Sequence, residues 1–120
     1  MLKPRIAVLV SGGGTNLQAL INARNVGYLA SGELALVISS KAGVQALARA
    51  RGAHIETATV ERSAFASQTA FEAALIETLE AHEIDLIVLA GFLLILSADF
   101  VSHYADRILN VHPSLIPAYC

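Results

Sequence analysis

The residues best suited to chemistry are Asn110 and His112, which stand two positions apart in the stretch Asn110-Val111-His112-Pro113-Ser114. Side chains of a strand alternate between its faces, so an extended backbone projects this amide and this imidazole to the same side. Pro113 has no N–H to donate to a strand ladder and therefore predicts that the strand ends at His112. An amide can donate a hydrogen bond to a developing oxyanion, and an imidazole can also donate a proton. The pair indicates acyl-type transfer without a nucleophilic side chain; the alternative is a histidine with only a structural role.

A second candidate site is the glycine-rich stretch Ser11-Gly12-Gly13-Gly14-Thr15, which follows an apolar run and precedes a predicted helix. It fails the dinucleotide fingerprint because Leu17 stands at the third glycine position and no acidic residue follows the next strand. It also lacks the Gly-Lys-Ser/Thr of a P-loop. What remains is a tight turn and a helix N-terminus bearing Thr15 and Asn16, which suits a single phosphate group. The alternative is an ordinary strand-to-helix turn.

Other common arrangements of catalytic residues are not supported by the spacing. The four histidines lack the spacing of zinc ligands, so we expect no metal site. Ser11 and Ser114 lie outside any Gly-x-Ser-x-Gly motif, which argues against a serine nucleophile. Cys120 is the only cysteine, so the chain cannot form an internal disulfide.

The elements that must position these residues alternate along the chain. Branched apolar runs predict strands over residues 5–10, 33–39, 54–59, 85–90 and 108–111, and helical periodicity predicts helices over about 16–23, 42–51, 67–82 and 97–104. Ser97 is expected to cap the last helix, and Gly52 to end the second. This alternation predicts one α/β domain over residues 1–120, a Rossmann-like parallel sheet flanked by helices. Residues 85–90 should be central and 54–59 near an edge, with ligands at the carboxyl ends of the strands.

Composition narrows the class of protein. Hydrophobic residues make up 55% and charged residues 15% of the 120, which indicates a packed domain and excludes disorder. We expect no membrane span and no nucleic-acid partner. We also expect a cytoplasmic location, because the start Met1-Leu2-Lys3 lacks a secretory signal. Residues 63–106 contain no Lys or Arg, so the first half should hold any anion. We interpret the glutamates near residues 72–83, including Glu72, as a solvated acidic helix surface.

Three stretches together resemble glycinamide ribonucleotide formyltransferases: residues 10–18, 89–97 and 109–117. The resemblance implies transfer of a formyl group from 10-formyltetrahydrofolate to the amine of phosphoribosylglycinamide in purine synthesis. It assigns substrate-phosphate binding to Gly14, Thr15 and Asn16. It makes Asn110 the residue that orients the formyl oxygen and stabilises the oxyanion, and protonated His112 the donor to the departing folate nitrogen. It also assigns the wall of the folate site to Leu93, Leu94, Ile95 and Leu96, which otherwise fit a core or helix-capping ledge.

The sequence departs from that family in three places. Gln68 and Leu94 stand where arginines are common, which should lower affinity for folate or anions. The family domain continues well beyond Tyr119 and later supplies an aspartate that raises the pKa of the catalytic histidine. We therefore expect a chain that lacks its C-terminal portion, has little activity alone and self-associates through an open sheet edge.

Several other functions remain open. Formyltetrahydrofolate deformylase shares the Asn-x-His-Pro-Ser core, and methionyl-tRNA formyltransferase is a weaker match. A non-catalytic ribotide-binding remnant, or half of a split protein completed by a partner, would also fit these residues.

Overall fold

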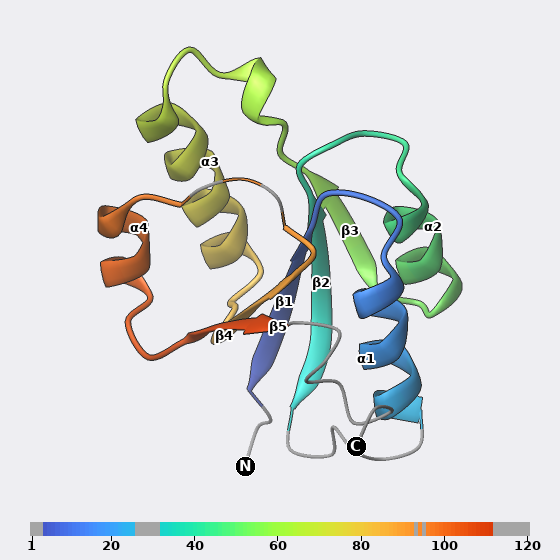
Figure 1. Cartoon of the computed structure of the whole chain (residues 1–120). Helices are drawn as coiled ribbons and strands as arrows, with labels where there is room; N and C mark the ends of the chain where they lie inside the picture. The colour runs from blue at the N-terminus through green and yellow to red at the C-terminus, as the bar shows by residue number, and fades with distance from the viewer. Residues whose placement is uncertain (1–3, 26–31, 93, 95, 112–120) are drawn as a thin grey trace.

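The computed structural model describes residues 4–25, 32–92, 94 and 96–111, and within them the chain forms a five-stranded parallel sheet between two layers of helices (Figure 1). The strand order is β3-β2-β1-β4-β5. In chain order the elements are β1 (Arg5–Val10), α1 (Thr15–Asn25), β2 (Glu33–Ser39), α2 (Gln45–Gly52), β3 (Glu56–Thr59), the 3₁₀ helix η1 (Arg62–Ala64), α3 (Gln68–Ala81), β4 (Leu86–Ala90), α4 (Ala98–His103) and β5 (Ile108–Val111).

The strands are apolar on both faces because helices cover both faces. In β1, Val8 and Val10 pack toward α1 and α2, whereas Ala7 and Leu9 pack toward α3 and α4. All four side chains are fully buried. A strand covered on both sides gains from burying every residue, and its sequence therefore reads as an uninterrupted apolar run. The predicted Rossmann-like α/β class is confirmed.

All nine predicted strands and helices are present, and their bounds agree with the prediction to within three residues. β1, β2 and β5 match residues 5–10, 33–39 and 108–111, and β3 lies at a sheet edge as predicted. β4 is an interior strand, although β1 rather than β4 occupies the middle of the sheet. Ser67 and Ser97 cap α3 and α4 by accepting hydrogen bonds from the N–H groups of Ala70 and Phe100.

The expected stop of the second helix at Gly52 is confirmed, because Gly52 is the last residue of α2, although the helix begins at Gln45 rather than at residue 42. The residue with positive φ at this ending is His54, at 62°, and not the glycine. There the His54 N–H donates to the Arg51 carbonyl at 3.0 Å and the Ile55 N–H to the Ala50 carbonyl at 2.9 Å. These are the two bonds of a Schellman ending, which satisfy carbonyl groups at the helix end. Ile55, which follows the reversal, is buried in the core on the α1–α2 side of the sheet.

The order of the strands creates a switch point between β1 and β4. From β1 the chain passes to α1 on one face of the sheet, and from β4 it passes to α4 on the other face (Figure 1). Connections that leave adjacent strands in opposite directions open a crevice at their carboxyl ends, where α/β proteins bind ligands. No helix in the described part of the chain combines the length and apolar character that a membrane crossing requires.

Candidate functional site

The carboxyl ends of three neighbouring strands meet at the switch point. In the parallel register, Leu9 of β1 pairs with Leu89 of β4, which in turn pairs with Asn110 of β5. β1 continues for one residue beyond Leu9 and ends at Val10, where the glycine-rich loop begins. The sheet therefore brings the predicted phosphate loop and Asn110 to the same edge, although about 95 residues separate them in the sequence.

The glycine loop rests directly on α2. Gly14 has a φ of +85°, and a Cβ added there would lie 2.8 Å from both Cα and Cβ of Ala46. Glycine is therefore required at this position both by conformation and by space. The Gly12 carbonyl accepts a hydrogen bond from the Ala46 N–H at 3.3 Å, and the Gly13 carbonyl accepts one from Arg49 Nε at 2.8 Å.

These two bonds decide where the loop's N–H groups point. The carbonyl and the N–H of a trans peptide point in opposite directions, so carbonyls held by α2 turn the N–H groups of Gly13 and Gly14 away from α2. The first turn of α1 adds further N–H groups with no partner inside the helix and the positive end of its dipole. Such a concave set of donors suits an anion.

The residues predicted to hold phosphate lie together at this turn. The Gly14 carbonyl accepts the first hydrogen bond of α1, from the Gln18 N–H at 2.8 Å. Thr15 is exposed at the start of the helix, and Asn16 is half-buried. Asn16 Nδ2 lies 4.0 Å from the position that a Cβ on Gly91 would occupy, so this amide lies beside the end of β4.

Two buried hydroxyl groups, from Ser11 and Ser40, pair where the glycine loop begins. Ser11 and Ser40 follow the ends of β1 and β2, and their side-chain oxygens lie 2.8 Å apart. The Ser40 N–H also donates to the Val10 carbonyl at 3.0 Å. Buried polar groups are costly unless paired, so this pair holds the exits of the two strands at a fixed spacing.

The predicted reacting pair is only partly described. Asn110 is exposed and shares its strand face with Ile108, which packs against the α3–α4 core. His112 lies outside the described residues, as do Leu93 and Ile95 of the predicted folate wall. Within that wall, Leu94 and Leu96 are partly buried against the same core.

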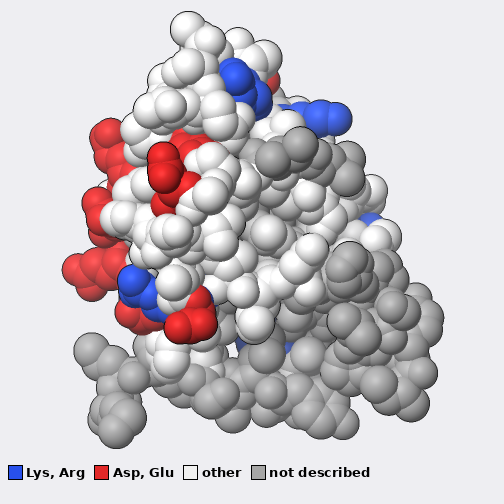
Figure 2. All heavy atoms as spheres, turned by 60° about the vertical axis from the view of Figure 1, so that its left-hand side comes forward, with Lys and Arg blue, Asp and Glu red and all other residues white. Residues whose placement is uncertain are grey.

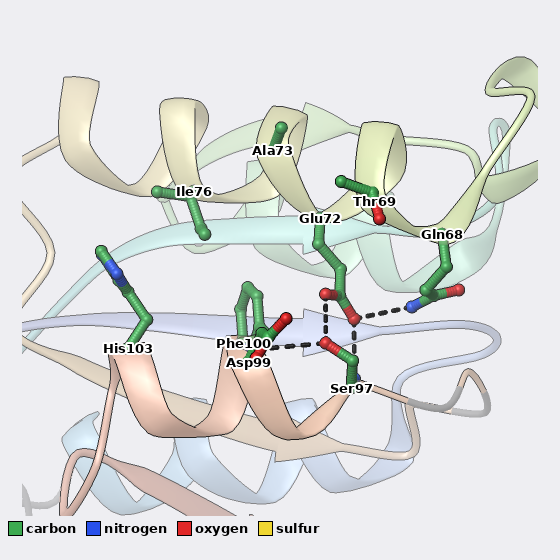
Figure 3. Close-up of a pocket in the computed structure, with 9 residues that line it drawn as sticks. All are labelled: Gln68, Thr69, Glu72, Ala73, Ile76, Ser97, Asp99, Phe100 and His103. Atoms are coloured by element: carbon green, nitrogen blue, oxygen red, sulfur yellow. Dashed lines mark hydrogen bonds between the residues drawn. The ribbon is translucent and has the colours of Figure 1, made fainter.

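Glu72 is not part of the solvated acidic surface, and the sequence interpretation of this residue is wrong. Only 6% of the residue is exposed. Its carboxylate accepts hydrogen bonds from the Ser97 N–H at 2.7 Å, the Ser97 hydroxyl at 2.5 Å and the Gln68 amide at 2.8 Å (Figure 3). Burial raises the pKa of Glu72, but these hydrogen bonds outweigh burial and leave the pKa below its ordinary value.

Glu72 ties α3 to the segment that follows β4. Ser97 is the residue directly after the predicted folate wall and the cap of α4, so its two bonds to Glu72 hold the end of that segment against α3. The helical periodicity of α3 places Glu72 next to the apolar stripe, and only the packing of α4 over it creates the partner. Sequence spacing alone carries no signal for this contact.

A groove of about 450 Å³ runs between α3 and α4 beside this contact (Figure 3). Gln68 lies in its wall and accepts a hydrogen bond from Arg62 Nε at 3.1 Å. A guanidinium group from η1 therefore lies beside the position at which the sequence lacks the expected arginine. The groove is lined by Gln68, Thr69, Glu72, Ala73, Ile76, Ser97, Asp99, Phe100 and His103.

Acidic side chains gather over the α3–α4 side of the molecule (Figure 2). Apart from Glu72, the acidic residues there are exposed: Glu77, Glu80, Glu83, Asp85 and Asp99. The interpretation of the glutamates as a solvated acidic helix surface is confirmed for Glu77, Glu80 and Glu83. Among the described residues, no group of three His, Cys, Asp or Glu side chains could hold a metal ion.

Comparison with known proteins places the chain among formyl transferases. The formyl transferase family model matches residues 4–120. The phosphoribosylglycinamide formyltransferase of Escherichia coli strain K12 is 49% identical over 114 residues, which cover 95% of this chain and 53% of that protein. The phosphoribosylglycinamide formyltransferase structure from Coxiella burnetii is 45% identical, with a TM-score of 0.87 over 98% of this chain and 55% of that one.

A formyltetrahydrofolate deformylase structure from Pseudomonas putida has a TM-score of 0.81 at 19% identity, a likeness that shows the fold alone. The chain spans about half the length of the two formyltransferases that it matches.

Proposed function

The chain belongs to the formyl transferase family, and from that membership we propose that it takes part in the formylation of phosphoribosylglycinamide by 10-formyltetrahydrofolate. The observation that supports the proposal is the glycine loop, whose carbonyls are turned toward α2, so that the N–H groups of Gly13 and Gly14 point away from that helix. This loop offers an anchor for the phosphate of a ribotide. Asn110 lies at the same edge of the sheet.

In the proposed reaction, the loop at Gly14, Thr15 and Asn16 holds the ribotide phosphate and so directs the glycinamide amine toward the strand ends. The folate supplies the formyl group. Asn110 donates a hydrogen bond to the formyl oxygen as negative charge develops there. A new carbon–nitrogen bond forms to the amine, which gives up one of its protons, and the bond to the folate nitrogen breaks. That nitrogen takes up a proton from His112, and the proton released by the amine restores His112.

The residues of the predicted folate wall fit a flat heterocycle. Leu94 and Leu96 are apolar and only partly buried, so each retains surface that an aromatic ring could cover. Glu72 supports this wall through Ser97, the residue that directly follows it. We expect the wall to contribute apolar contacts, with hydrogen bonds to the folate coming from backbone groups.

The proposal is tested by incubating the chain with ribotide and 10-formyltetrahydrofolate and following the deformylated folate. The chain alone is expected to have little activity, but the turnover that is measured should require the ribotide and should be lost in Asn110→Ala and His112→Ala. His103→Ala, which changes an exposed histidine on α4, should retain it.

Other outcomes would contradict the proposal in distinct ways. Deformylation that needs no ribotide would instead support the deformylase. Protection of the chain by ribotide, without turnover under any condition, would support a non-catalytic ribotide-binding protein.

A further inference from the structure

The orientation of the Gly13–Gly14 peptide cannot be set by side chains of its own residues. A Cβ placed on Gly12 or Gly13 would meet no atom within 4 Å, so a side chain at either position would have nothing to pack against. Glycines on both sides of a peptide also permit it to rotate at little conformational cost. The hydrogen bonds of the peptide must therefore fix which of its two polar groups faces the switch point.

Arg49 of α2 supplies that hydrogen bond. Its Nε donates to the Gly13 carbonyl at 2.8 Å, and its Nη1 donates to Gln18 Oε1 on α1 at 3.1 Å. A Cβ on Gly14 would lie 3.2 Å from Arg49 Cδ, so the arginine stem also packs against the turn. The rigid, planar guanidinium thereby joins α2, the glycine loop and α1 at one point.

We infer that Arg49 is a positioning residue for phosphate binding, an inference that rests on the function proposed above. It keeps the Gly13 carbonyl turned toward α2, and this places the Gly14 N–H on the side where the phosphate binds. Without Arg49 the peptide can rotate and present carbonyl lone pairs, which repel an anion. The loop would then have to be ordered by the ligand, and that ordering lowers affinity.

The test is titration with ribose 5-phosphate, followed through the amide resonances of the loop, for the original chain, Arg49→Met and Arg51→Met. Arg51 is a matched control because it lies on the same helix and is exposed. We expect Arg49→Met to weaken binding about tenfold, equivalent to about 1.4 kcal/mol, and Arg51→Met to stay within about twofold. An equal effect of both variants would overturn the inference.

High salt separates positioning from simple charge attraction. At 1 M KCl the Debye length falls to about 3 Å, so a long-range attraction between the guanidinium and the phosphate is screened. If Arg49 acts by positioning, the ratio of the ribose 5-phosphate dissociation constants of Arg49→Met and Arg51→Met stays the same at high salt. If the two dissociation constants become equal at 1 M KCl, Arg49 acts as an attracting charge and the positioning role is refuted.

Backbone order parameters of Gly12 to Gly14 in the ligand-free protein provide a readout that does not depend on binding. They should fall in Arg49→Met and stay unchanged in Arg51→Met; unchanged values in both would refute the inference. If the original chain fails to bind ribose 5-phosphate, the proposed function fails, while the order parameters still decide the role of Arg49. Should Arg49→Met not fold, Arg49→Lys keeps the charge but replaces the Nε donor with a methylene, and the same loosening is expected.

Discussion

Neutralising Glu72 should destabilise the protein, and the loss should depend on pH in a defined direction. The carboxylate is buried and accepts three hydrogen bonds from Ser97 and Gln68. Hydrogen bonds to a charged acceptor are roughly twice as strong as neutral ones, so Glu72→Gln should cost about 1–2 kcal/mol at pH 7. Glu72→Ala should cost about 3 kcal/mol, because it leaves the Ser97 N–H and hydroxyl without their acceptor.

The sign of the pH dependence follows from the lowered pKa of Glu72. A lowered pKa means that the folded state favours the ionised carboxylate more than the unfolded state does. The stabilisation is therefore fully present above the ordinary value of about 4.5 and is lost as the pH falls through the folded pKa. The stability difference between the original chain and Glu72→Gln should be largest near pH 7 and should shrink below about pH 4.5.

Urea unfolding at several pH values measures this difference. Glu77→Gln is the matched control, since Glu77 is exposed on the same helix and its replacement should change stability by less than about 0.5 kcal/mol. Equal unfolding free energies for the two variants at pH 7, or a difference that grows on acidification, would refute the reasoning. In a double-mutant cycle, Glu72→Ala and Ser97→Ala should be non-additive by at least about 0.5 kcal/mol, because the two residues share their bonds.

Three further variants have defined outcomes. Gly14→Ala should lower the free energy of unfolding by about 1–3 kcal/mol, because it places a Cβ against α2 at a residue with positive φ. Gly13→Ala is the control: its Cβ meets open space, so it should cost less in the same denaturant titration. The pKa of His82 is raised by its hydrogen bonds to the Thr78 carbonyl and the Glu56 carboxylate. His82 should therefore stabilise the fold below about pH 6.5, and this contribution should be lost as the pH rises through the pKa of the folded state. His82→Gln should therefore be most destabilising near pH 5, and equal losses at pH 5 and pH 8 in thermal unfolding would argue against this. Leu109→Lys should reduce self-association in sedimentation with little change in stability, since Leu109 is 59% exposed on β5.

Local sequence patterns predicted the elements well because their causes are local. The apolar runs of β1 and β2 and the cap at Ser97 depend on residues within a few positions of one another. The end of α2 at Gly52 was predicted, but the reversal of the chain lies at His54, and the sequence, in which a glycine is the usual signal, did not indicate this.

The residues that organise the candidate site were predicted only in part. Gly14, Thr15 and Asn16 form one turn and are adjacent in sequence, so their grouping was visible from spacing. Arg49 lies 36 positions from the glycine whose carbonyl it binds. No periodicity links two such residues, and only the packing of α2 beneath the loop brings them into contact.

The sequence by itself determined the order and type of the elements and the two stretches that carry chemistry, because periodicity, turns and short motifs are properties of neighbouring residues. Tertiary structure alone decided the rest. It turned the carbonyls of Gly12 and Gly13 toward α2, and it made Glu72 a buried link between α3 and α4 instead of a surface glutamate. The physical reason is that hydrogen-bond direction and burial depend on partners far away in the chain, which meet only when the sheet and its two helical layers assemble.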